Sequence, residues 1–258
     1  MLKDNNVMSR IQQDRPALVT LIEKNRHAPC NTCGSGSKAH LNQMDDYLRD
    51  VETLTGFHQV TGYGKALNLL KSNATTGKTE PEAFIIRVIR QELATFTPGT
   101  VVELEGNRTN YNGTEPDVVL VGGVLCEFKS WSVLEADENE EEDGTVPASY
   151  DASKSQFWNF ERGFNPSFTQ FTRYLAQISS LNGLRYYFDG RKPGGDENYV
   201  KGVCQTLFQT TSQSGFPIIY QINPAIFNIG GITSAADFLN VVNSNNLNHP
   251  IYGFIQVK

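Results

Sequence analysis

The sequence predicts an α/β protein with a mixed central sheet and a helical N-terminal region. Two stretches, residues 79–96 and 168–181, repeat apolar residues at helical spacing. Three short β-rich runs follow the first stretch, and the glycine pair between the second and third run is typical of a hairpin turn. The length of 258 residues allows one large domain with an appended region, since a domain averages roughly 150 residues.

The N-terminal region is predicted to consist of helices joined by polar turns. Apolar residues follow helical spacing over residues 7–22 and 41–54, and residues 62–70 predict a further short helix. Residues 72–78 then have the composition of a linker. We therefore expect a boundary after residue 78, with a helical region over 1–78 and the main domain over 79–258.

The first core helix is predicted at residues 79–96, because Thr79 and Glu82 form a capping-box pattern and Pro98-Gly99 ends the stretch. Strands are expected at 101–104, 116–121 and 124–131. An acidic insertion over 133–150 separates them from the helix at 168–181, which ends at Asn182-Gly183, and from a strand at 184–188. The remainder predicts helices at 199–208 and 235–242 and strands at 218–222 and 252–257.

The net charge of −6 argues against a partner held mainly by bulk positive charge. Most of this deficit is local, since residues 135–143 contain seven of the 28 acidic residues and the remaining 21 nearly balance the 22 basic ones. The acidic stretch has the composition of a solvated loop, which is one interpretation of it. The other is that it repels DNA or docks a basic partner.

The start of the chain has no apolar segment typical of a signal peptide, and no apolar run approaches the roughly 20 residues needed to cross a bilayer. We therefore expect no membrane segment. The expected location is the cytoplasm, or the outside of the cell after export by a dedicated secretion system.

The segment that carries chemistry is residues 115–129. If Gly122-Gly123 turns a hairpin, Asp117 comes close to Glu127 and Lys129, which share one face of their strand. Two carboxylates suit Mg²⁺ or Mn²⁺, and the lysine can orient or deprotonate a water that attacks a phosphoester. Alternatively, Asp117 is a turn residue, and Glu127 and Lys129 belong to a solvated strand face.

At these residues the sequence resembles the PD-(D/E)xK nuclease superfamily, over roughly residues 79–188. The resemblance implies a restriction-endonuclease-like core in the order helix, three strands, helix, strand. It implies that Asp117 and Glu127 ligate the metal, that the Phe128 carbonyl adds an oxygen, and that Lys129 serves the attacking water. Many members also place an acid on the first core helix, for which Glu82 is favoured over Glu92.

Gln170 and Tyr174 resemble the QxxxY pattern of RecB-like nucleases, and their i, i+4 spacing puts both on one helix face. Core packing is the competing explanation for Tyr174. Nucleic-acid contacts are expected from Arg173 and Tyr174, and from Arg191 and Lys192 in a glycine-rich basic loop.

A second cluster at His27, Cys30, Cys33 and His40 has ligands that zinc accepts. The pair Cys30 and Cys33 has the spacing of a half-site, but the sequence has no second CxxC. Free thiols or a disulfide are the alternatives.

These features predict a Mg²⁺-dependent DNase. The compact core behind a helical lead-in is similar to nuclease domains of bacterial polymorphic toxins, which implies a delivered antibacterial toxin held by an immunity protein. The alternatives are a repair, recombination or restriction nuclease, and a catalytically inactive nucleic-acid-binding module of the same fold. The sequence leaves open DNA or RNA preference, endo or exo action, and the oligomeric state.

Overall fold

A computed structural model describes residues 49–76, 80–130, 170–191 and 196–258. The chain divides into two compact units, Met1–Gly56 and Phe57–Lys258. In the first unit the described residues 49–55 are helical. The second unit contains the sheet and is described below.

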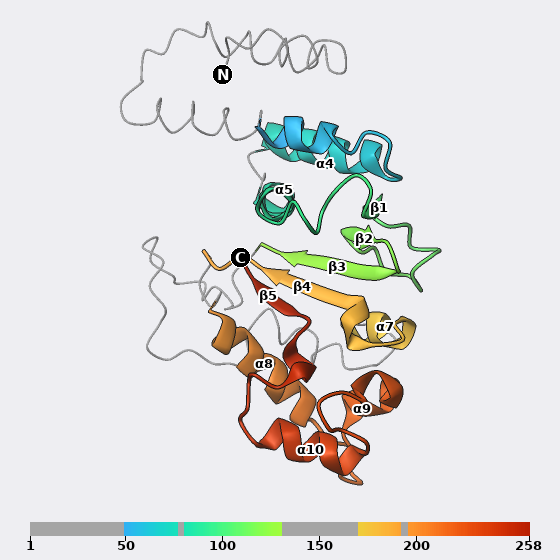
Figure 1. Ribbon diagram of the computed structural model, residues 1–258, viewed down its shortest axis with the longest axis vertical. Helices are drawn as coiled ribbons and strands as arrows, with labels where there is room; N and C mark the ends of the chain where they lie inside the picture. The colour runs from blue at the N-terminus through green and yellow to red at the C-terminus, as the bar shows by residue number, and fades with distance from the viewer. Residues whose placement is uncertain (1–48, 77–79, 131–169, 192–195) are drawn as a thin grey trace, which may run out of the picture. The chain divides into compact units, whose positions relative to one another are not determined.

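The second unit is built on a five-stranded mixed sheet (Figure 1). Its strands are β1 (Val101–Leu104), β2 (Val118–Leu120), β3 (Val124–Lys129), β4 (Leu184–Phe188) and β5 (Ile255–Val257), in that spatial order. Strands β1 to β3 are antiparallel neighbours, whereas β4 runs parallel to both β3 and β5. The predicted α/β class with a mixed sheet is confirmed.

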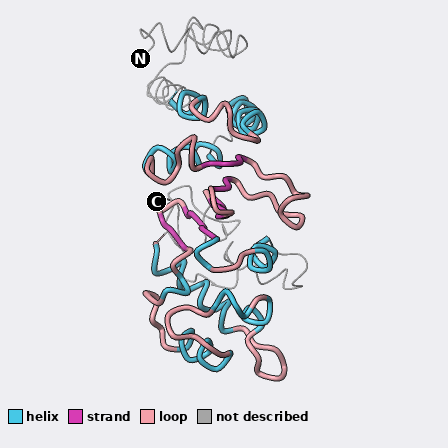
Figure 2. Tube along the Cα trace, turned by 45° about the vertical axis from the view of Figure 1, so that its right-hand side comes forward, coloured by secondary structure: helices cyan, strands magenta, loops and turns pink. Residues whose placement is uncertain are grey.

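Helices cover both faces of the sheet, as Figure 1 and the turned view of Figure 2 show. Helix α5 (Glu80–Gln91) lies on one face with α4 (Tyr63–Thr76), and α7 (Gln170–Gln177) and α8 (Glu197–Gln209) lie on the other. On the α5 face, the Phe128 ring contacts Phe84 and stacks on Tyr187. On the α7 face, Phe171 packs edge-on against Tyr186. Strand alternation therefore places Phe128 and its neighbour Glu127 on opposite faces.

The β2–β3 hairpin fixes the register of the strands that carry the candidate site. Gly122 and Gly123 both have positive φ, which glycine adopts without steric cost. Beyond the turn, Val118 pairs with Cys126. The ladder ends at this pair, and the residues that follow it on the two chains are Asp117 and Glu127.

The C-terminal part adds α9 (Ile218–Ile222) and α10 (Ala235–Asn243) to an aromatic core below α8. The prediction of a strand at 218–222 was wrong: Pro217 occupies the N-cap position of a short helix whose Ile219 and Tyr220 are buried. A short apolar run cannot distinguish a strand from a buried helix by periodicity. The predicted strand at 252–257 is confined to residues 255–257, because Pro250 begins a 3₁₀ turn that ends at Tyr252.

The expected boundary after residue 78 needs correction. The second unit begins at Phe57, and α4 extends through much of the stretch with linker composition. Helix α4 joins the sheet because the Leu104 amide donates to the Thr61 carbonyl, and Gly62 approaches Leu104 too closely for a side chain. Among the described helices, none is long and apolar enough to cross a membrane.

Candidate active site

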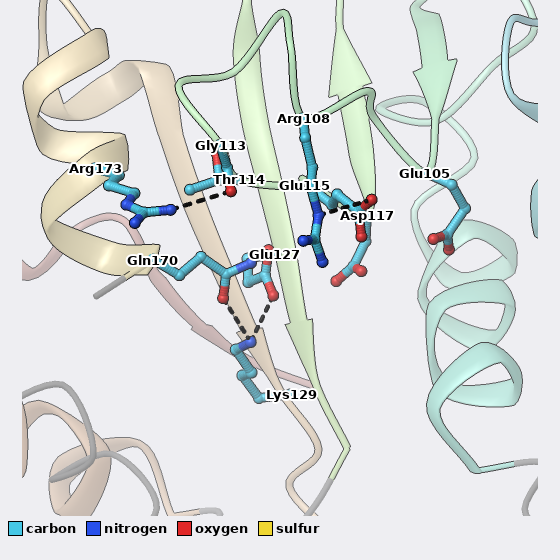
Figure 3. Close-up of a pocket in the computed structure, with 10 residues that line it drawn as sticks. All are labelled: Glu105, Arg108, Gly113, Thr114, Glu115, Asp117, Glu127, Lys129, Gln170 and Arg173. Atoms are coloured by element: carbon cyan, nitrogen blue, oxygen red, sulfur yellow. Dashed lines mark hydrogen bonds and ion pairs between the residues drawn. The ribbon is translucent and has the colours of Figure 1, made fainter. Parts of the chain in front are cut away.

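A pocket of about 350 Å³ opens at the end of the β2–β3 ladder (Figure 3). Its floor is formed by strand residues and its walls by the β1–β2 connection and by α7. The lining residues are Glu105, Arg108, Gly113, Thr114, Glu115, Asp117, Glu127, Lys129, Gln170 and Arg173. Asp117, Glu127, Lys129, Gln170 and Arg173 were predicted from the sequence as site residues, and the fold brings all five to this pocket.

Asp117 lies where β2 and β3 stop pairing as regular strands. A regular ladder would place Pro116 opposite Phe128, but proline has no amide hydrogen to donate. The Asp117 side chain bonds the end of β3 instead: its Oδ2 accepts a hydrogen bond from the Phe128 amide at 2.7 Å. Burial raises the pKa of Asp117 well above its ordinary value, and the nearby carboxylates of Glu127 and Glu105 raise it further.

Glu127 and Lys129 form a buried ion pair on the floor of the pocket. The Lys129 ammonium lies 2.5 Å from Glu127 Oε1, and the two residues are only 7% and 4% exposed. This burial rules out the alternative of a solvated strand face. Buried charges are tolerated when they are paired and hydrogen-bonded.

The predicted QxxxY pair completes the hydrogen bonding of Glu127. The Tyr174 hydroxyl donates to Glu127 Oε2 at 2.8 Å, and the Gln170 amide donates to the same oxygen at 3.1 Å. Gln170 also accepts from Lys129 Nζ at 3.3 Å and donates to the Tyr174 hydroxyl at 3.1 Å. Tyr174 is completely buried. It is therefore both a core residue and a positioning residue for Glu127, and its predicted contact with nucleic acid stays a prediction.

Glu105 is a pocket residue that the sequence reasoning missed. Its amide donates to the Asp117 carbonyl, which puts it opposite Asp117 on the neighbouring strand edge. The acids thus lie side by side at one edge of the sheet: Glu105 directly follows β1, Asp117 directly precedes β2, and Glu127 lies in β3. The only sequence signal was an acid at the end of a predicted strand; the bulge in β1 between Val101 and Glu103 hides its register.

Two arginines from different segments of the chain lie at the pocket mouth. Arg108 comes from the β1–β2 connection, and Arg173 comes from α7 and donates to the Gly113 carbonyl at 3.1 Å. Gln177 of α7 also donates to the Tyr111 carbonyl of the same connection. The connection is therefore fastened to α7 at two points. Arg108 was not predicted, because an isolated arginine in a polar loop carries no pattern.

The donor set of the pocket suits a hard divalent cation in part. Among the described residues, no group of three or more His, Cys, Asp or Glu side chains is placed to hold a metal. Mg²⁺, however, commonly uses one or two carboxylates and keeps several waters. Asp117 and Glu127 are the two carboxylates on the pocket floor that could hold such an ion. The Phe128 carbonyl points to the same side of β3 as its amide, which donates to Asp117, but Phe128 does not line the pocket, and its role as a metal ligand stays a prediction.

The two acids considered for the first core helix have different outcomes. Glu92 lies just beyond the end of α5, where it pairs with Lys258 at 2.5 Å and accepts from the Tyr187 hydroxyl. Tyr187 belongs to the α5 face of the sheet, so the sheet separates Glu92 from Glu127. The backbone of Glu82 lies in the first turn of α5, and its side chain falls outside the described residues.

Arg191 was predicted to contact nucleic acid, but it does not line the pocket. Its guanidinium forms two hydrogen bonds to the buried Asp189 carboxylate, which also binds Arg87. Burial raises the pKa of Asp189, but the hydrogen bonds from Arg191 and the charge of Arg87 outweigh it, and the pKa is lowered.

Several predicted features lie outside the described residues. They are Lys192, the zinc candidates His27, Cys30, Cys33 and His40, and the acidic stretch 135–143.

Comparison of the chain with models of known families, with curated proteins and with solved structures found no match. The chemistry of the pocket is therefore the basis on which a function can be assigned.

Proposed function

We propose that this protein is a Mg²⁺-dependent nuclease that cleaves DNA, with a PD-(D/E)xK-type active site at Asp117, Glu127 and Lys129. The observation that supports the proposal is the convergence of these residues with Gln170 on the floor of one pocket whose mouth carries Arg108 and Arg173. A metal-dependent phosphodiesterase needs carboxylates that hold the metal and cations that bind the phosphate, and the floor and the mouth of this pocket supply them.

In this proposal each residue has a separate task. Asp117 and Glu127 would hold Mg²⁺, which polarises the phosphoryl oxygen, lowers the pKa of a water and offsets negative charge on the leaving oxygen. Lys129 holds the attacking water and stabilises the charge that develops on the phosphate. Gln170 and Tyr174 keep the Glu127 carboxylate in one orientation through their hydrogen bonds to Oε2.

The arginines of the pocket mouth support a polyanionic substrate, although the pocket lining has four acids against three bases and the chain has a net charge of −6. The pocket mouth has two arginines, whose guanidinium groups pair with phosphate in bidentate geometry. With few phosphate contacts, the affinity for DNA should be modest and weakly dependent on salt.

The test is incubation of the purified full chain with supercoiled, linear and single-stranded DNA and with RNA, in Mg²⁺, Mn²⁺, Ca²⁺ or EDTA. We expect DNA cleavage with Mg²⁺ or Mn²⁺, and none with EDTA or with Glu127→Gln. Glu197→Gln is the matched control, because Glu197 is an exposed glutamate of α8 that pairs with Lys201. If Glu127→Gln cleaves as well as the parent, the active site is wrong; if the parent cleaves nothing, the inactive binding module is the better interpretation.

A further inference from the structure

A second charged cluster lies at the mouth of the same pocket. Arg108 Nε lies 3.1 Å and Lys65 Nζ 3.4 Å from a single oxygen of Glu115, Oε1. Lys65 comes from α4 and Arg108 from the β1–β2 connection, so two distant segments place their cations around one negatively charged oxygen. Glu115 lies two residues before Asp117.

The arrangement has the form of an anion site filled by the protein's own carboxylate. Two cations that share one oxygen are the arrangement in which Arg and Lys side chains commonly bind a phosphate oxygen. Arg108 is 71% exposed, Lys65 44% and Glu115 39%, so all three are reachable from solvent. Exposed ion pairs of this kind are weak, and an incoming anion can replace the carboxylate.

The backbone around the cluster keeps it in place. The Gly106 amide donates to the Pro116 carbonyl, which closes the base of the connection that carries both Arg108 and Glu115. Contacts from α7 to Gly113 and Tyr111 hold its far end. Removal of the Glu115 carboxylate would therefore leave Arg108 and Lys65 beside the pocket, with Lys65 Nζ still 3.8 Å from Glu105 Oε2.

We propose that Lys65 and Arg108 form a binding site for a phosphate of the nucleic-acid backbone, and that Glu115 occupies this site until the substrate displaces it. The proposal rests on the proposed nuclease function for the identity of its ligand. In this proposal Lys65 and Arg108 bind the substrate, and the Glu115 carboxylate competes with the substrate phosphate for them. This competition weakens the binding of short or poorly placed substrates.

The test measures the affinity for a fluorescent DNA duplex in Ca²⁺, so that binding is read without relying on cleavage. Glu115→Gln should bind about two- to tenfold more tightly than the parent, because the competing charge is removed. Lys65→Ala and Arg108→Ala should each weaken binding and lower the slope of log affinity against log salt by about 1. Glu197→Gln and Lys201→Ala remove the same charges from α8 and should change affinity little.

The decisive measurement is Glu115→Gln in the Lys65→Ala/Arg108→Ala background. The gain in affinity should disappear there, since nothing remains for Glu115 to block. An equal gain in both backgrounds, or an equal gain from Glu197→Gln, overturns the proposal. Thermal melting confirms folding, and Lys65→Gln/Arg108→Gln serves if the alanine variant is unfolded.

A second arm separates this proposal from the nuclease function. Tripolyphosphate binding, measured by calorimetry, should follow the same order of variants if the site accepts free phosphate as well as the DNA backbone. If the protein cleaves DNA but Glu115→Gln gives the same gain in affinity in both backgrounds, the nuclease function is supported and the phosphate site is overturned. If the protein cleaves nothing but the gain from Glu115→Gln still requires Lys65 and Arg108, the phosphate site is supported and the nuclease function is overturned. If neither DNA nor tripolyphosphate binds, the phosphate site is overturned.

Discussion

Asp117, the residue just before β2, lies across from Glu127 of β3, because the last pair of the ladder is Val118 and Cys126. Like charges that face each other across an antiparallel ladder destabilise the folded state. Lys129 offsets the charge of Glu127 at 2.5 Å, whereas Asp117 accepts a backbone amide. The protein without metal therefore keeps an acid in an unfavourable place, and this cost can be measured.

We predict that Asp117→Asn stabilises the metal-free protein at pH 7 by about 0.5–1 kcal/mol, and abolishes cleavage. Asparagine can still accept the Phe128 amide but carries no charge. Because the pKa of Asp117 is raised in the folded state, the parent loses stability as pH rises through that value. Near and below pH 4 the carboxyl is protonated in both states, and the advantage of the variant disappears. Denaturant unfolding in EDTA at several pH values measures this.

The same variant tests the metal site. Mg²⁺ should raise the melting temperature of the parent, which regains stability when the two acids share a cation, and should raise that of Asp117→Asn much less. Glu197→Gln controls for net charge. An unchanged response to Mg²⁺ in Asp117→Asn would show that Asp117 does not hold the metal.

The sequence allowed this pair to be predicted because Gly122-Gly123 fixed the turn, and the turn fixes the register. Glu105 could not be predicted in the same way, since its position depends on a bulge in β1. The pairing of Arg191 with Asp189 could not be predicted from the sequence, because Asp189 becomes a buried partner only in the folded chain. The predicted phosphate contact of Arg191 stays a prediction. Local patterns therefore predicted the floor of the pocket, and long-range packing determined its rim.

We predict that Tyr174→Phe reduces cleavage about 10- to 100-fold, because it removes a hydrogen bond that orients a proposed metal ligand. The loss of a hydrogen bond to a charged group should also cost about 1.5–3 kcal/mol of stability. Cleavage at increasing Mg²⁺ should show part of the defect as weaker metal binding. Tyr220→Phe is the control, because Tyr220 is also buried and lies far from the pocket residues in sequence. An equal loss of cleavage in Tyr220→Phe would show that Tyr174 has only a packing role.

We predict that Arg173→Ala and Arg191→Ala have different effects. Arg173 lines the pocket and holds Gly113, so its loss should weaken DNA binding and reduce cleavage about tenfold or more. Arg191 forms an ion pair with Asp189, and its loss should cost stability while leaving the affinity for DNA within about twofold. Anisotropy with labelled DNA and thermal melting separate the two effects. A selective loss of DNA affinity in Arg191→Ala would restore the interpretation of its loop as a phosphate contact.

We predict that Lys129→Met loses cleavage by about 100-fold or more, since a positioned group that serves the attacking water typically contributes that much. The variant also removes the counter-charge from buried Glu127, which should cost about 3–5 kcal/mol in the absence of metal. Mg²⁺ should then stabilise Lys129→Met more than the parent, because the cation no longer competes with an ammonium for Glu127. Melting curves in EDTA and in Mg²⁺ measure this difference, with Lys201→Met as the control on the Glu197–Lys201 pair of α8. If Mg²⁺ stabilises Lys129→Met no more than the parent, then Glu127 does not hold the metal, which is bound, where it binds, by other groups.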